Sequence, residues 1–365
     1  MLVQRPHYPE VPPQLAELFA AEGLSLLGIA ECSSDEQAAA RYQQWIDSGH
    51  AAQMHYLVRH APLKYSPQQL LQGCRSILMA GMNYYRRSSA ATDQARVARY
   101  AWGRDYHLVL GKRLRRLARR LGQSYGNQQF RSFTDATPLD ERFFGERAGV
   151  GFSGRNTLLI SGQYGSWFLL GGILSTQLFP ATPAPKGSHG ACPRSCRRCI
   201  DVCPTGALLG PNRIDASRCI SYLTIELRGS IPVQLRSAIG NWLFGCDLCQ
   251  EVCPLNLRAQ VTTEQDFLHD RAGESPDLSG ILAIENDLQF AARFAGTPLM
   301  RARRQGLVRN ACVVAANTRR HDLKSLLQRC SADSDAVIAE HARWALAVLA
   351  ADENQTASEW VGTRC

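Results

Sequence analysis

The cysteines are the feature of this sequence that most restricts its fold. Eight of the thirteen lie between positions 192 and 253, and the other five are scattered along the chain. Within this segment the pattern Cys-x2-Cys-x3-Cys-Pro occurs twice, in CRRCIDVCP and in CDLCQEVCP. This spacing is typical of bacterial ferredoxins, in which the last cysteine of one run binds the iron-sulfur cluster of the other. The sequence therefore predicts two interleaved clusters.

Two [4Fe-4S] clusters need eight thiolates, and Cys219, between the two runs, can complete the second set. One predicted set is Cys192, Cys196, Cys199 and Cys253, and the other is Cys203, Cys219, Cys246 and Cys249. Three residues separate Cys192 from Cys196 where two are usual, so the role of Cys192 stays open. A pair of zinc sites is the alternative, because Cys-x2-Cys pairs also bind zinc, although zinc sites do not need the Cys-Pro ends.

Composition places the chain among ordinary globular proteins. It has 365 residues, of which 45% are hydrophobic and 20% charged, enough for two or three cores. The N-terminal segment lacks the basic and apolar regions of a signal peptide, and no apolar run is long enough to span a membrane. We therefore expect a cytoplasmic protein, in which cysteines bind metals more often than they form disulfides. The net charge of +9 weakly favours a polyanionic partner.

The part that precedes the cysteines predicts mixed helices and strands. Residues 14–30 predict a helix followed by a strand, residues 74–85 a buried strand, and residues 156–176 two strands joined by a turn. Residues 107–123 predict an amphipathic helix with Leu110, Leu114, Leu117 and Leu121 on one face and Lys112, Arg113, Arg115, Arg116, Arg119 and Arg120 around the rest. Such a helix is most often a solvated surface, and contact with nucleic acid is the alternative.

The C-terminal part predicts stacked helices. The segments RNACVVAAN and EHARWALAVL match at an offset of 31 residues, which is typical of a pair of short HEAT-like repeats. They could present a binding surface or form a cap over the cluster segment. The predicted fold is α+β and multidomain, with an α/β catalytic domain at 1–184, a ferredoxin-type domain at 185–260 and a HEAT-like helical domain at 261–365.

Three blocks of the sequence carry a resemblance to a known family. RYAWGRDYH at 99–107, SFTDATPLDERFFGERAGVGFSGRNTLLI at 132–160 and RCISYLTIELRGSIPVQLRSAIGNWLFGCDLCQEVCPLN at 218–256 resemble the epoxyqueuosine reductases, and the similarity extends over nearly the whole chain. This family is related to reductive dehalogenases. The resemblance implies an oxidoreductase that uses cobalamin to convert epoxyqueuosine to queuosine in the tRNA anticodon loop, the last step of queuosine biosynthesis.

The resemblance also implies roles for individual residues. The aspartate of the D-x-x-P-x-x-E-R block is the family's proton donor and corresponds to Asp135, which without the resemblance would be read as a turn residue. Two [4Fe-4S] clusters would pass electrons to cob(I)alamin from an external donor such as a flavodoxin or ferredoxin. The implied cobalamin contacts are Tyr106, His107, Asp135, Arg155, Asn156 and Thr157, and Ser221, Tyr222 and Asp247 would reach cobalamin or tRNA.

Two chemical expectations accompany this resemblance. Asp135 must hold a proton near neutral pH, so we expect burial beside the corrin and tRNA to raise its pKa or a water chain to protonate it. The family often has GEIL where this chain has GGIL at 171–174, which removes an acidic side chain. A monomer that does not contact membranes is expected. The alternative functions are a corrinoid reductase for a small molecule and a tRNA-binding protein with structural clusters.

Overall fold

The structure is a computed structural model that describes residues 11–91, 93–183 and 191–362. These residues form two compact units, each built from three segments. The first unit combines Met1–Arg86, Asp105–Ala216 and Leu248–Leu268, and the second combines Arg87–Arg104, Ser217–Asp247 and His269–Cys365. The division into three consecutive domains stays a prediction.

The first unit is organised around a four-stranded sheet. Its strands are β1 (Ser25–Glu31), β2 (Ser76–Asn83), β4 (Phe130–Phe133) and β7 (Phe168–Ser175), in the order β1-β2-β7-β4. The predicted helix and strand at 14–30 are confirmed as α1 (Pro13–Ala20) and β1, and the strand at 74–85 is confirmed as β2. Every neighbouring pair is antiparallel. The sequence left this direction open, because apolar runs indicate strands but carry no information about how they pair.

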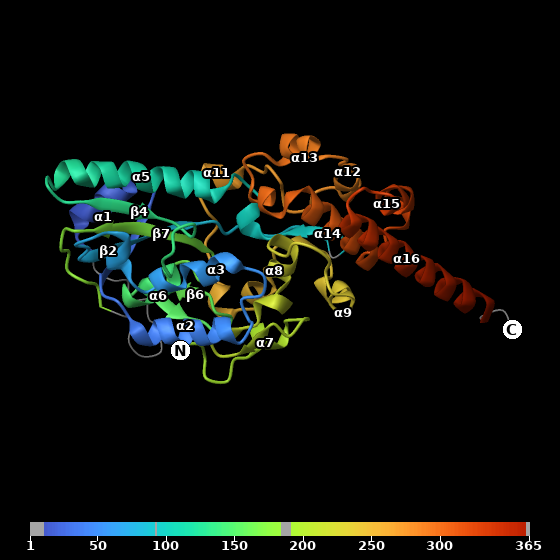
Figure 1. The fold of residues 1–365 in the computed structure, drawn as a ribbon, viewed down its shortest axis with the longest axis horizontal. Coiled ribbons are helices and arrows are strands. Elements are labelled where there is room, and N and C mark those ends of the chain that lie inside the picture. Colours follow the sequence, from blue (N-terminus) through green and yellow to red (C-terminus); the bar gives the residue numbers. More distant parts are fainter. Residues whose placement is uncertain (1–10, 92, 184–190, 363–365) are drawn as a thin grey trace. The chain divides into compact units, whose positions relative to one another are not determined.

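The predicted amphipathic helix is confirmed as α5 (Tyr106–Ser124), which packs on β4 and β7 (Figure 1). All four leucines of its predicted apolar face are fully buried. The helix approaches the sheet closely at Gly171, where a Cβ atom would lie 2.9 Å from Cδ1 of Leu114. A Cβ atom on Gly172 would lie 2.2 Å from the Leu78 carbonyl oxygen, so this sheet has no room for an acidic side chain there.

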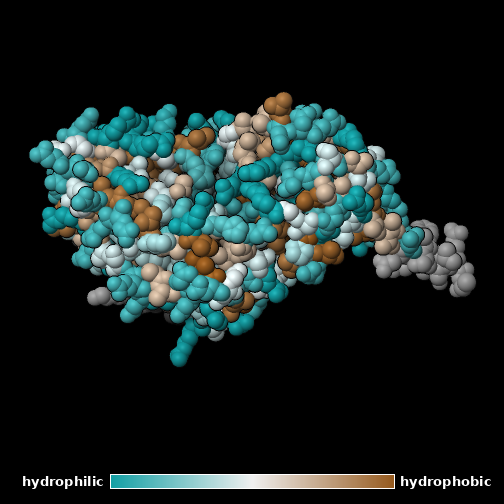
Figure 2. All heavy atoms as spheres, in the orientation of Figure 1, coloured by the Kyte–Doolittle hydropathy of each residue, from teal (hydrophilic) through white to brown (hydrophobic). Residues whose placement is uncertain are grey.

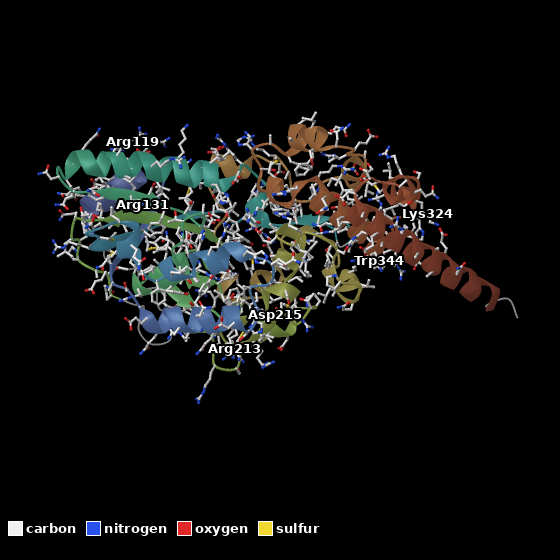
Figure 3. The ribbon with its side chains drawn as sticks, in the orientation of Figure 1. Arg119, Arg131, Arg213, Asp215, Lys324 and Trp344 are labelled. Carbon is white, nitrogen blue, oxygen red and sulfur yellow. The ribbon has the colours of Figure 1, made fainter. Side chains whose placement is uncertain are left out.

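The basic face of α5 is partly neutralised within the unit. Arg113 pairs with Glu264 at 2.6 Å, and Arg116 and Arg120 both pair with Glu22 at 2.7 and 3.0 Å. Arg119 is exposed and points away from the helix into solvent (Figure 3). The solvent side of α5 is correspondingly hydrophilic (Figure 2). Both interpretations of this helix, a solvated surface and a contact with nucleic acid, stay predictions.

A small hairpin follows α6 (Glu141–Arg147) along the chain. Strands β5 (Gly151–Ser153) and β6 (Leu159–Ser161) pair with each other, whereas β7 joins the main sheet. Both strands predicted within 156–176 are thus present as β6 and β7, but they belong to different sheets. The other helices of this unit are α2 (Glu36–Asp47), α3 (His55–His60), η1 (Ala61–Leu63), α4 (Pro67–Leu70), α6 (Glu141–Arg147), α7 (Arg198–Asp201), α10 (Leu248–Glu251), η6 (Pro254–Asn256) and α11 (Gln265–Leu268), and its remaining strands are β8 (Leu208–Gly210) and β9 (Arg213–Ile214).

The second unit is mainly helical. Its one strand pair is β3 (Arg96–Val97) with β10 (Trp242–Phe244), which run parallel. Its helices are η2 (Arg99–Ala101), α8 (Ile220–Ile225), α9 (Val233–Arg236), η5 (Ser237–Ile239), α12 (Leu278–Leu282), α13 (Asp287–Phe294), η7 (Pro298–Ala302), α14 (Arg303–Asn317), η8 (His321–Leu323), α15 (Lys324–Ser331) and α16 (Ala336–Gly362), and η4 (Ala216–Arg218) spans the boundary between segments of the two units. Helices α14, α15 and α16 pack together over an apolar core.

The two matching segments of the C-terminal part bury polar side chains. Arg309 and Asn310 in α14 and His341 in α16 are all fully buried. Arg309 donates hydrogen bonds to the carbonyl oxygens of Leu223, Leu227 and Gly229 at 2.6, 3.0 and 2.7 Å. His341 accepts a hydrogen bond from the Ile231 N–H through Nε2 at 3.1 Å. Both helices therefore hold the backbone of the segment that follows α8.

Within the described residues, no helix is both long enough and apolar enough to cross a membrane.

Candidate functional site

Four side chains gather where α5 begins. Asp105 caps the helix and accepts a hydrogen bond from the backbone N–H of His107 at 3.0 Å. Its Oδ1 atom also lies 2.8 Å from Nδ1 of His107, while Nε2 of the same ring lies 3.0 Å from Oδ1 of Asp135. The hydroxyl of Tyr106 donates to Oδ2 of Asp135. The structure thus brings together the predicted Tyr106, His107 and Asp135 and adds Asp105, which sequence reasoning missed.

Local structure explains this geometry. Asp135 lies in a turn directly after β4, closed by a 2.7 Å hydrogen bond from the Thr137 N–H to the Thr134 carbonyl oxygen. The rings of Tyr106 and His107 stack at a centroid distance of 4.1 Å. Because these residues are adjacent at the first turn of a helix, both side chains can reach the carboxylate from the same side. The signal for Asp105 was its N-cap position before an apolar periodic segment.

The pKa values of Asp135 and His107 are both shifted from their ordinary values. Burial raises the pKa of Asp135, but the hydrogen bond and charge of His107 and the hydrogen bond of Tyr106 outweigh it, so the pKa lies below its ordinary value. The upward shift expected from burial beside the corrin and tRNA stays a prediction, since the lowered pKa belongs to the protein by itself. Burial lowers the pKa of His107, but the two aspartates outweigh it and raise the pKa to about 10. At neutral pH the proton of this constellation resides on the imidazole.

A second acid of the same sequence block is buried nearby. Burial, with smaller contributions from the charges of Asp135 and Asp140, raises the pKa of Glu141 to about 8. Its Oε1 atom is buried and has no hydrogen-bond partner among the described residues. Glu141 is thus a neutral acid at pH 7. No sequence pattern indicates this state, because it depends on how α6 packs.

The four cysteines of the first predicted set line one cavity. Its lining residues are Arg155, Asn156, Ile160, Cys192, Pro193, Cys196, Arg198, Cys199, Cys253, Pro254 and Leu255. Burial, together with the neighbouring thiols, raises the pKa of Cys199 and of Cys253. Four thiolates this close repel one another unless a cationic centre lies between them. Cys192 lies with the other three despite its unusual spacing.

The turn of the β5–β6 hairpin faces this cavity. The Gly154 N–H bonds the Leu158 carbonyl oxygen, and the Thr157 N–H bonds the Gly154 carbonyl oxygen, both at 2.8 Å. Thr157 has a φ of +67°, the left-handed conformation that closes such a loop. The Arg155 N–H points at Sγ of Cys192 at 3.4 Å. The structure brings Arg155 and Asn156 to the cysteines, whereas the resemblance implies cobalamin contacts.

The remaining predicted site residues are divided between the units. Cys203 and Cys249 belong to the first unit, and Cys219 and Cys246 belong to the second.

Asp247 in the second unit is 2% exposed and forms a 3.0 Å ion pair with Arg99, whose backbone N–H donates to the same oxygen at 2.9 Å. Tyr222 is buried and Ser221 is half-buried. Arg99 is a further site residue that sequence reasoning missed.

Comparison with known proteins identifies the family. A curated epoxyqueuosine reductase of Pseudomonas aeruginosa is 37% identical to this chain over 93% of its length and 95% of the relative's. The chain belongs to the epoxyqueuosine reductase family. The reductase of Escherichia coli is 33% identical over 92% of this chain and 89% of the relative. A model described as "Epoxyqueuosine reductase QueG, DUF1730" matches residues 64–136, which include the Tyr106, His107 and Asp135 constellation.

Solved structures and a second sequence-family model agree with this assignment. An epoxyqueuosine reductase crystallised with an epoxyqueuosine-modified tRNA-Tyr stem loop matches with a TM-score of 0.84 and 28% identity, over 92% of this chain and 89% of that one. A Bacillus subtilis member matches with a TM-score of 0.81 and 27% identity, over 91% and 89%, and was solved with its catalytic aspartate loop swung out of the active site. A 4Fe-4S double cluster binding domain matches residues 192–256, which confirms iron-sulfur clusters over the zinc alternative.

Proposed function

We propose that this enzyme reduces epoxyqueuosine to queuosine in the anticodon loop of tRNA, with Asp135 as the proton donor to the epoxide oxygen. The observation that carries the proposal is the Asp135 carboxyl, which is 46% exposed and held by Tyr106 and His107. An exposed acid with fixed donors on both oxygens can present a proton to a substrate and receive another from a neighbour. The family assignment and the stem-loop complex of a relative support the substrate.

The chain's own residues supply a route for this proton. His107 carries a proton on Nε2, 3.0 Å from Asp135, because its pKa is raised to about 10. When Asp135 approaches the substrate oxygen, transfer from His107 leaves a neutral acid in position and a neutral imidazole behind it. Asp105 on Nδ1 keeps the ring oriented throughout. Burial by substrate would further raise the pKa of the Asp135 carboxyl and favour this transfer.

Opening the epoxide and releasing its oxygen as water consumes two electrons and two protons, and cobalamin, when bound, supplies the electrons to carbon. Tyr106, His107 and Asp135 fit such a ligand, since the two stacked rings at the start of α5 and the Asp135 carboxyl form a partly exposed polar surface. Both nitrogens of His107 face carboxylates at 3.0 Å or less. The ring is therefore engaged as an orienting group for the acid and would not be free to bind cobalt.

The remaining assignments extend this proposal. One [4Fe-4S] cluster would bind Cys192, Cys196, Cys199 and Cys253, and the other Cys203, Cys219, Cys246 and Cys249. The clusters would receive single electrons from a flavodoxin or ferredoxin. We also propose three consecutive domains, at 1–184, 185–260 and 261–365, the last built from HEAT-like repeats. The protein would be a cytoplasmic monomer. Further cobalamin or tRNA contacts would be Arg155, Asn156, Thr157, Ser221, Tyr222 and Asp247.

Replacing the acid tests the mechanism. Asp135→Asn keeps the size and polarity of the side chain but removes the proton that is transferred in each turnover. We expect queuosine formation to fall roughly a hundredfold to ten-thousandfold, measured by nucleoside analysis of epoxyqueuosine-containing tRNA. Cobalt reduction and tRNA binding should persist in the same preparation, because neither needs this proton.

Arg119→Gln serves as the matched control, since Arg119 is exposed on the solvent side of the adjacent helix. It should react at the wild-type rate. Near-normal queuosine formation by Asp135→Asn would exclude this residue as the donor. Reduction of a small epoxide with no reaction on the tRNA would instead identify a small-molecule reductase.

A further inference from the structure

Asn156 is a buried amide at the cysteine cavity with an unused hydrogen-bond donor. The residue is 4% exposed and lines the cavity together with the four cysteines. Its Oδ1 atom accepts the Leu158 N–H at 3.4 Å, which fixes the orientation of the amide, because only the oxygen can accept. Nδ2 has no hydrogen-bond partner among the described residues. Buried donors of this kind are rare in native proteins unless a further acceptor serves them.

Apart from Asn156 itself, the side-chain acceptors at this cavity are sulfur atoms. The turn that carries Asn156 already directs one donor at them, since the Arg155 N–H lies 3.4 Å from Sγ of Cys192. The lining side chains other than the cysteines are two arginines, Asn156 and apolar or proline residues, none of which accepts a hydrogen bond through its side chain except Asn156 itself. A [4Fe-4S] cluster held here would place sulfide and thiolate sulfurs in this space.

We propose that Asn156 donates an Nδ2–H hydrogen bond to a sulfur of the cluster held by the first cysteine set, and thereby raises its reduction potential. The inference rests on the proposed ligand set. Reduction adds one negative charge to the cluster, and a hydrogen bond to sulfur stabilises the more negative state more strongly. In this role Asn156 would act through the cluster, so it is a positioning residue for electron transfer.

Two substitutions remove the donor in different ways. Asn156→Leu keeps the approximate size without polar atoms, and Asn156→Asp keeps the oxygen that accepts from the Leu158 N–H. In the full-length, anaerobically reconstituted protein, each variant should reduce this cluster less readily. At the potential where the wild-type cluster is half reduced, we expect the reduced-to-oxidised ratio to fall at least tenfold, a shift of about 59 mV for one electron, measured by redox titration followed by EPR.

A spectroscopic readout separates a direct bond from a general change in packing. With 15N-labelled asparagine, pulsed EPR of the reduced wild-type cluster should show a weak 15N coupling that both Asn156 variants lose. The control is Gln163→Leu, which removes an exposed amide just after β6 and should leave the potential and the coupling unchanged. The other cluster is the internal reference and should keep its potential.

The outcomes are distinguishable. An unchanged potential in both Asn156 variants with full iron and sulfide would refute the inference alone, as would an equal shift of the two clusters. If Asn156→Leu loses iron, the reduction potential of Asn156→Asp decides the outcome, because its side chain keeps the size of asparagine. Wild-type protein that binds iron and sulfide for only one cluster, at the second cysteine set, would refute the ligand set and the inference together.

Discussion

The buried histidine of α16 predicts a specific loss of stability in acid. His341 is fully buried and bonds the Ile231 N–H through Nε2, so its other nitrogen carries the proton and donates to the Val337 carbonyl oxygen at 2.7 Å. Burial lowers the pKa of His341 to about 4, and the positive charges of Arg236 and Arg309 contribute, whereas the bond to Val337 opposes the shift. Protonation would also abolish the acceptor that the Ile231 N–H uses.

The sign and size follow from proton linkage. An unfolded histidine titrates near pH 6.5, so between pH 6.5 and about pH 4 the unfolded chain binds a proton at His341 that the folded chain does not bind. Stability is therefore complete above the unfolded pKa and falls as the pH is lowered. From about pH 7.5 to about pH 5 this amounts to roughly 2 kcal/mol, at about 1.4 kcal/mol for each pH unit of full titration.

Urea denaturation of the wild-type protein and of His341→Gln at the two pH values measures this effect, with the helical circular dichroism signal as the probe. Glutamine stays neutral, so the variant is less stable at neutral pH but should lack this part of the pH dependence. Groups such as Asp333 titrate in both proteins and cancel in the difference. An identical pH dependence of the two proteins would refute the account of His341 as a buried neutral side chain.

Two arginine predictions complete the set. Arg304 is 9% exposed, pairs with Asp333 and donates to the Ile284 carbonyl oxygen at 3.0 Å, so Arg304→Ala should lower the unfolding free energy by about 3 kcal/mol or more. Arg303 is exposed on the same helix, and Arg303→Ala should change the unfolding free energy by no more than about 0.5 kcal/mol. Equal losses in urea denaturation would contradict this prediction. Reversing the charges of Arg301 and Arg303 together should weaken tRNA binding and reduce its salt dependence, because fewer counterions are released; unchanged affinity at two salt concentrations would place the tRNA contact elsewhere.

Local sequence patterns were sufficient for much of this protein. The period of the leucines predicted α5, and the apolar runs predicted β1, β2, β6 and β7, because burial of one helix face or one strand leaves a periodic trace. The double Cys-x2-Cys-x3-Cys-Pro pattern predicted the iron-sulfur domain, because cluster ligation restricts the spacing of its ligands along the chain.

The direction of the strands, the partner of β6 and the states of the site residues depended on the tertiary structure. Nothing in the sequence near Asp135 indicates that His107 and Tyr106 hold its carboxylate and lower its pKa, because those contacts join residues 28 and 29 positions apart. Asn156 likewise reads as an ordinary turn residue, and only the fold brings it to the cysteine cavity and leaves its donor unused. The spacing of cysteines along the chain reflects the geometry of the cluster that they bind. A pKa or an unpaired donor instead depends on every group that surrounds it in space.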